Sequence, residues 1–143
     1  MKILHNISSI DQTYGGPLFS MKLIAESQHK LGHNVAIISS IRNKENSRIE
    51  INKDIKLITA PSFSKFRYSK NWENLLFKEF GLPEIIHTYG TWTYHNLIAS
   101  IIAKKYNIPH IIAPCGMLYK AGIENNNMTP KKALWTLFQK KAF

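Results

Sequence analysis

The sequence contains little cysteine and no long apolar run. Cys115 is the single cysteine among 143 residues, so no disulfide can form within the chain, which is compatible with a reducing cytoplasm. No run of about 18 apolar residues occurs, so no membrane-spanning helix is expected. Met1 leads straight into an apolar segment without a small-residue cleavage site, which argues against a signal peptide. We therefore expect a cytoplasmic protein.

Acidic residues are also scarce, because nine Asp and Glu stand against 19 Lys and Arg and leave a net charge of +10. A solvated surface, an anionic membrane and nucleic acid are the three explanations of such an excess. No helix-turn-helix, zinc-finger or single-strand-binding signature accompanies the charge, so nucleic acid is not expected. A solvated face and a peripheral contact with the inner face of a membrane both remain open. The local concentrations of positive charge are Lys65, Arg67 and Lys70, interleaved with Phe63, Phe66, Tyr68 and Trp72, and then Lys131, Lys132, Lys140 and Lys141.

Cofactor and metal signatures are missing. Neither the Gly-x-Gly-x-x-Gly fingerprint nor a Walker A motif is present, so a bound dinucleotide is not implied. Besides His87, the histidines show no spacing typical of metal ligands, and we expect no metal and no resident cofactor. These histidines are His5, His29, His33, His95 and His110.

What the sequence does contain is an alternation of short apolar strands and helical segments. Strands are predicted at 2–7, 35–40 and 55–60, and further apolar strand segments at 85–86 and 111–112. A helix is predicted from Pro17 to a left-handed cap at Gly32, and another helix around 97–102. The apolar face of the first helix is assigned to Leu18, Met21, Ile24, Ala25 and Leu31. This order predicts an α/β fold with a Rossmann-like, doubly wound parallel sheet, in one domain spanning 1–143.

Three glycine-containing loops follow predicted strands, and we expect them to share the carboxyl edge of the sheet, where open α/β sheets bind ligands. The first is Tyr14-Gly15-Gly16-Pro17, where side-chain-free backbone can approach a phosphate or a sugar at the start of a helix. The second begins at His87-Thr88-Tyr89-Gly90 and continues to Trp92, and the third contains Pro114-Cys115-Gly116. No catalytic residue can be named, but the predicted substrate-binding residues are Gly15, Gly16, His87, Tyr89, Trp92, Cys115 and Gly116.

Three of these residues admit two interpretations. His87 can face a ligand and donate a hydrogen bond or move a proton, or it can be a satisfied structural histidine. Trp92, together with Tyr94, can offer an apolar face to a sugar ring or can pack the loop onto the sheet. Cys115 is interpreted as a small packing thiol, with a nucleophilic cysteine as the alternative.

In order and spacing, these segments resemble the amino-terminal lobe of glycosyltransferase family 4, whose members have two Rossmann-like lobes (the GT-B fold). The Gly15-Gly16 loop and the Gly32-His33 end of the first helix match the pattern of the family. The loops at 87–92 and 113–118 resemble its His-x-His-Gly-x-Trp and Ser-Pro-(His or Arg)-Gly-Met-Leu segments. The resemblance extends through 130–143, where a Lys-Lys-Ala-Leu-Trp helix is expected.

The resemblance implies the acceptor-side lobe of a nucleotide-sugar-dependent transferase that retains anomeric configuration and makes polysaccharides or lipid-linked glycans. The leaving diphosphate would help to deprotonate the acceptor. The second lobe of the family, which carries most of the donor site, has no counterpart before Phe143, nor do the last strand and helix of the first lobe. We therefore expect a truncated product, inactive alone, although a partner chain could complete it.

Two residues depart from the pattern: Tyr89 replaces a histidine and Cys115 replaces the basic residue. A non-catalytic, flavodoxin-like binding module is the alternative.

Overall fold

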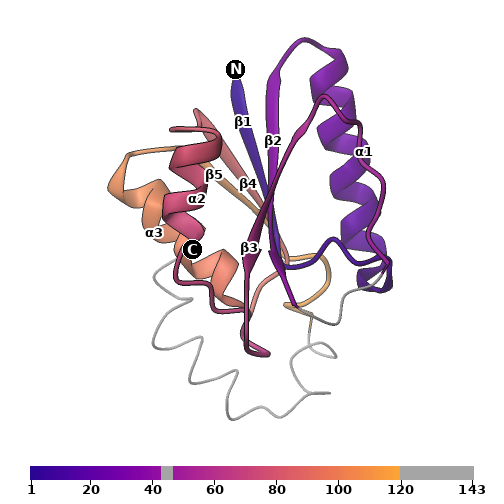
Figure 1. Cartoon of the computed structure of the whole chain (residues 1–143), viewed down its shortest axis with the longest axis vertical. Helices are drawn as coiled ribbons and strands as arrows, with labels where there is room; N and C mark the ends of the chain where they lie inside the picture. The colour runs from indigo at the N-terminus through magenta and orange to yellow at the C-terminus, as the bar shows by residue number, and fades with distance from the viewer. Residues whose placement is uncertain (43–46, 120–143) are drawn as a thin grey trace.

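The computed structural model describes residues 1–42 and 47–119 and contains an all-parallel sheet flanked by helices (Figure 1). The five strands lie in the order β3-β2-β1-β4-β5, so the predicted doubly wound, Rossmann-like α/β fold is confirmed. The strands are β1 (Lys2–Ile7), β2 (Asn34–Ile41), β3 (Lys56–Pro61), β4 (Ile85–Tyr89) and β5 (His110–Ala113). The helices are the 3-10 turn η1 (Gln12–Tyr14), α1 (Gly16–Lys30), α2 (Trp72–Glu79) and α3 (Tyr94–Lys105).

Two apolar cores lie on the two faces of the sheet. Helix α1 covers one face, and α2 and α3 lie together on the other (Figure 1). Because successive side chains of a strand point to opposite faces, β1 contributes Ile3 and Ile7 to the α1 side and Leu4 to the other. Strand β2 is buried from Val35 to Ser40, as expected of a central strand covered on both faces.

Helix α1 begins at Gly16, one residue before the predicted Pro17, and the predicted left-handed glycine, Gly32, follows its end. Gly15 is the N-cap with φ of 76°, and Gly32 follows the helix with φ of 86°. The predicted apolar face was too wide, because only Leu18, Met21 and Ala25 are buried. Ile24 is 38% exposed, because it precedes the buried Ala25 by one residue and its side chain therefore points about 100° away around the helix axis. Leu31 is 77% exposed, because it lies beyond Lys30, the last residue of the helix.

Helix α2 was not predicted, and it takes up Trp72, the last aromatic residue of the basic aromatic segment. Trp72 is the first residue of α2 and is fully buried in the core with Leu76. The rings of Phe66 and Tyr68 lie edge-on against Tyr94, with centroid distances of 6.2 and 4.8 Å. The alternation of basic and aromatic residues therefore reflects tertiary packing in part, while Phe63 remains exposed.

The ends of β4 and β5 also differ from the prediction. The segment His87-Thr88-Tyr89 belongs to β4, whose loop begins only at Gly90. The two strands are parallel neighbours, with Ile86 opposite His110 and Tyr89 opposite Ala113, so their loops do leave from one edge. The expected helix in 130–143 and the basic residues from Lys131 to Lys141 lie outside the described residues. Within the described part of the chain, no helix is long and apolar enough to cross a membrane.

Candidate functional site

The candidate site lies at the carboxyl edge of the sheet, between β1 and β4. From β1 the chain turns to β2 through α1 on one face, whereas from β4 it turns to β5 through α3 on the other. The two connections therefore leave the edge in opposite directions. In doubly wound sheets such a switch point opens the crevice in which ligands bind. The loops at this edge comprise 8–15 after β1, 90–93 after β4 and 114–119 after β5.

The glycine loop after β1 leaves open space at the start of α1. A Cβ added to Gly15 or to Gly16 would meet no atom within 4 Å. Only Gly15 has a positive φ; Gly16 is already the first helical residue, so its value does not require glycine. Gly16 has no positive φ because the turn is completed one residue earlier, at Gly15. The open space remains suited to the close approach of a ligand to the helix N-terminus.

We predict that Gly16→Val weakens ligand binding more than it weakens the fold. The new side chain would occupy the open space in front of α1, while Gly16 has no positive φ that would oppose it. We expect at least a tenfold loss of affinity for an acceptor glycan and a change of less than about 1 kcal/mol in the free energy of unfolding. Isothermal titration and urea unfolding measure the two quantities. Equal losses of affinity and stability would show that Gly16 is only a turn residue.

The loops after β4 and β5 are joined by three hydrogen bonds. The Gly90 N–H donates to the Ala113 carbonyl at 2.7 Å, and the Trp92 indole Nε1 donates to the Met117 carbonyl at 3.1 Å. Between them, the Thr91 N–H lies 3.2 Å from Met117 Sδ. Trp92 has φ of 68°, in the left-handed region that non-glycine residues rarely adopt. The indole of Trp92 therefore helps to fix the loop, and its half-buried ring remains at the edge of the site.

All three loops approach one another closely at Gly90. Its φ is 84°, and a Cβ there would lie 3.1 Å from the Tyr14 hydroxyl and 3.2 Å from Met117 Cε. Tyr14 comes from the loop after β1 and Met117 from the loop after β5. Burial raises the pKa of Tyr14, so its hydroxyl remains protonated at neutral pH. Gly90 thus allows the side chains of both neighbouring loops to meet over the end of β4.

We predict that Gly90→Val destabilises the fold more than Gly32→Val. The two glycines have nearly equal φ values of 84° and 86°, but a Cβ at Gly32 would meet nothing within 4 Å. Gly32→Val therefore measures the backbone strain alone, about 1–2 kcal/mol. Gly90→Val adds overpacking of about 1–3 kcal/mol. Urea unfolding of both variants gives the difference, and equal destabilisation would disprove the close approach at Gly90.

His87 and Tyr89, both predicted to bind substrate, lie on the α1 side of β4 and are linked to each other. The Tyr89 hydroxyl lies 3.0 Å from His87 Nδ1 and 3.1 Å from Nδ1 of His5 on β1. Tyr89 is only 2% exposed, and burial raises the pKa of its hydroxyl. His87 is half-buried, which lowers its pKa. Of the pair, His87 is therefore the residue that a ligand can reach.

His95 and His110 are structural histidines. His95 is fully buried at the start of α3, where its Nε2 lies 3.1 Å from the Tyr89 carbonyl and its Nδ1 contacts the Thr93 hydroxyl. Nε2 of His110 lies 2.8 Å from the Thr88 hydroxyl on the other face of the sheet. Burial lowers the pKa of each histidine to about 4. The described residues contain no group of three or more His, Cys, Asp or Glu that could hold a metal.

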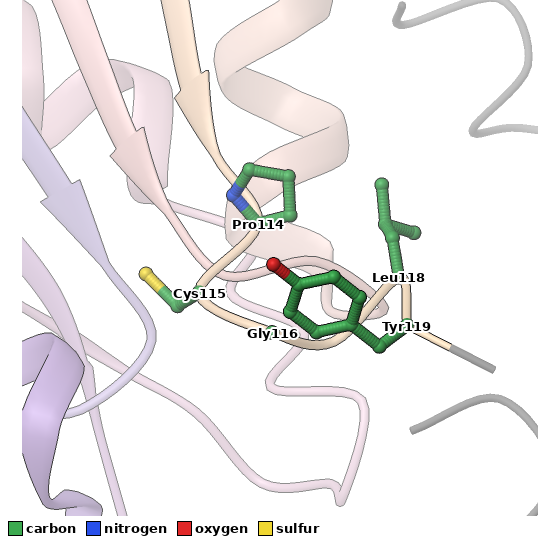
Figure 2. A pocket seen from close by; sticks show the side chains of 5 residues that line it. All are labelled: Pro114, Cys115, Gly116, Leu118 and Tyr119. Atoms are coloured by element: carbon green, nitrogen blue, oxygen red, sulfur yellow. The ribbon is translucent and has the colours of Figure 1, made fainter. Parts of the chain in front are cut away.

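Cys115 is exposed and has φ of 53°, next to Gly116 with φ of 80°. Its thiol donates to the Ala113 carbonyl at 3.2 Å, and partial desolvation raises its pKa. A raised pKa keeps the thiol protonated, which argues against the nucleophilic alternative. Cys115 borders a concavity of about 360 Å³. Figure 2 shows its sulfur pointing away from Leu118; the lining residues are Pro114, Cys115, Gly116, Leu118 and Tyr119.

Several residues of this edge were not predicted from the sequence. Tyr14 reaches Gly90 from the first loop, and Met117 holds the second and third loops together. Arg67 donates from Nη1 to the Ser40 carbonyl at 3.1 Å. The pKa of Asp11 is lowered chiefly by hydrogen bonds from Thr13, and the charge of Arg67 adds a smaller contribution. Arg67 was grouped with the surface lysines; its φ of 59° marks a turn that directs it back to the sheet. None of these contacts follows from sequence spacing.

Comparison with protein-family models and with curated proteins finds no match to this chain. The fold class and the geometry of the carboxyl edge therefore carry the functional argument.

Proposed function

We propose that this chain forms the acceptor-side lobe of a nucleotide-sugar-dependent glycosyltransferase of the GT-B type, acting with retention in the synthesis of a polysaccharide or a lipid-linked glycan. The observation that carries the proposal is the switch point between β1 and β4, bordered by the Gly15-Gly16 loop and by the paired loops at 90–93 and 114–119. Such an edge suits a ligand that meets exposed backbone, a half-buried histidine and a half-buried aromatic ring.

The strand order favours this proposal over a flavodoxin-like module. The order β3-β2-β1-β4-β5 is that of a Rossmann sheet, in which the third strand lies outside the second. In the flavodoxin-like order the third strand lies on the other side of the first. A Rossmann sheet agrees with the family that the sequence resembles, whose members have two Rossmann-like lobes.

We assign roles to the site residues accordingly. The acceptor lies against Gly15, Gly16 and Gly116, where little side-chain volume obstructs it. His87 binds a hydroxyl of the sugar, and the ring of Trp92 borders it. The nucleotide sugar is held mainly by a second lobe, and the leaving diphosphate takes part in deprotonating the acceptor, so neither a metal nor another cofactor is required.

A peripheral contact with an anionic membrane is part of the proposal. Phe63 is 85% exposed, and Lys65 and Lys70, also exposed, lie close to it in sequence. An apolar side chain beside cations can enter the headgroup region while the lysines contact anionic lipids. This position at the inner face of the membrane would bring a lipid-linked acceptor to the edge of the sheet.

The test is a chimera in which this chain is joined to the second lobe of an intact transferase of the same type. We expect transfer from, or hydrolysis of, at least one nucleotide sugar, and no activity when Gly16→Val is introduced. The isolated chain should be stabilised against heat by an acceptor glycan. Absence of activity with every nucleotide sugar would refute the proposal, and stabilisation by free flavin alone would support the binding module instead.

A further inference from the structure

A continuous chain of hydrogen-bonding groups runs from α1 through the sheet to His87. Gln28 Oε1 lies 2.7 Å from His5 Nε2, and His5 Nδ1 lies 3.1 Å from the Tyr89 hydroxyl. The same hydroxyl lies 3.0 Å from His87 Nδ1. His5 is fully buried and Tyr89 is 2% exposed, so water does not compete for these contacts. The chain begins at a carbonyl oxygen and ends at a half-buried imidazole.

The Gln28 side-chain carbonyl determines which group donates and which accepts in each of these hydrogen bonds. A carbonyl oxygen only accepts, so His5 Nε2 must carry a proton and donate it to Gln28 Oε1. A neutral histidine has one N–H, so His5 Nδ1 is bare and accepts from the Tyr89 hydroxyl. The Tyr89 hydroxyl has a single proton, and it donates this proton to His5 Nδ1. Its oxygen must therefore accept from His87 Nδ1.

We propose that Gln28, His5 and Tyr89 are positioning residues that fix the proton of His87 on Nδ1, so that its Nε2 presents a lone pair to a ligand. Among the described residues, Nε2 of His87 has no hydrogen-bond partner. It lies on the face of the sheet where the neighbouring residue of β5, Ile111, is 49% exposed. The face is therefore accessible at this point.

A bare Nε2 selects the chemistry of the ligand. It accepts a hydrogen bond from a hydroxyl or an amide N–H, and it repels the oxygens of a phosphate or a carboxylate. The ligand group at His87 is therefore a hydroxyl or another neutral donor such as an amide N–H, and not an anion. The assignment of this group to a sugar hydroxyl rests on the proposed function, whereas the placement of the His87 proton on Nδ1 does not.

Neutrality of both histidines follows from their surroundings. His5 is enclosed by β1, Gln28 of α1 and the rings of His87 and Tyr89 of β4, with no acid among its contacts. Burial lowers its pKa to about 4. The ring of His87 stacks on Tyr89 at a centroid distance of 4.2 Å, and burial lowers its pKa as well. Neither ring carries a charge that would override the direction set by Gln28.

The tautomers can be measured directly by long-range ¹H–¹⁵N correlation spectra of the labelled full chain at pH 7.5, because protonated and bare ring nitrogens have well-separated ¹⁵N shifts. We expect His87 to carry its proton on Nδ1 and His5 on Nε2. A proton on His87 Nε2 in the unmodified chain would overturn the proposal.

Gln28→Met tests whether Gln28 sets the donor direction of the hydrogen bonds that lead to His87. Methionine has nearly the shape of glutamine but lacks the carbonyl, so we expect the Nε2–H tautomer of His87 to rise at least severalfold in population. Ser27→Met, at the exposed neighbouring position of α1, is the matched control and should leave the tautomers as they are. Unchanged tautomers in Gln28→Met would show that Gln28 does not set the direction. None of these measurements needs transferase activity, so their outcome is independent of the proposed function.

Discussion

Acidification from pH 7 to pH 5 is expected to destabilise this chain strongly. The pKa values of His5, His95 and His110 are each lowered by burial from 6.5 to about 4, so these residues remain neutral in the native state. In the unfolded chain they bind protons as the pH falls below 6.5. Between pH 6.5 and 4 the unfolded state therefore holds up to three more protons, and its stability relative to the native state rises by up to about 4 kcal/mol per pH unit.

Such a loss is comparable to the whole stability of a domain of this size, about 5–15 kcal/mol. Urea unfolding at about pH 7.5, 6.5, 5.5 and 5 measures how the free energy of unfolding changes with pH. As the pH rises above 6.5, the three histidines of the unfolded chain lose their protons and their contribution to the slope falls towards zero. His95→Asn removes one of the titrating groups, so its slope should be about one third smaller, whatever its stability at neutral pH. A free energy of unfolding that is constant from pH 7 to 5 would contradict the prediction.

Restoring a basic residue at the third loop, by Cys115→His or Cys115→Arg, is expected to raise transfer by about 100-fold or more in the two-lobed chimera. The prediction rests on the proposed function. Cys115 lies at the ligand edge, and a cation or imidazole there can act on charge that develops beside the reacting carbon, whereas a neutral thiol cannot. The chimera with Cys115 should be slow but active.

The structure removes one objection to this substitution. A larger side chain at Cys115 was expected to strain a core, but the residue is exposed, and histidine is among the residues found in left-handed conformations. We therefore expect melting temperatures to be nearly unchanged. Cys115→Ala is the control, and its rate should equal that of the cysteine chimera. If the His and Arg chimeras melt lower and transfer no faster, Cys115 is a packing residue and the active edge does not include it.

Much of the fold was predictable because strand and helix patterns are local. Apolar runs bounded by turn residues located all five strands, and Gly32 ended α1 with the positive φ that was predicted. Helix α2 was missed because eight residues with only Trp72 and Leu76 buried give a short, weak period. The aromatic residues before it suggested a binding loop, whereas Phe66 and Tyr68 contact Tyr94 from another element.

The site was predictable in outline but not in its contacts. Parallel neighbours share one edge, so the loops containing Trp92 and Cys115 had to lie together, and they do. His5 was set aside because an isolated histidine in an apolar strand carries no pattern. Its partners, Gln28 and Tyr89, are 23 and 84 residues away in sequence.

The sequence by itself determined the alternation of strands and helices, the parallel sheet and the edge at which a ligand would bind. These depend on side-chain periodicity, on glycine and proline at turns, and on the chirality that makes crossovers right-handed. Only the tertiary structure decided which side chains meet there: Tyr14 over Gly90, and Gln28 with His5, Tyr89 and His87. Hydrogen bonds between strands far apart in the chain depend on register and burial, and both are set when the whole sheet assembles.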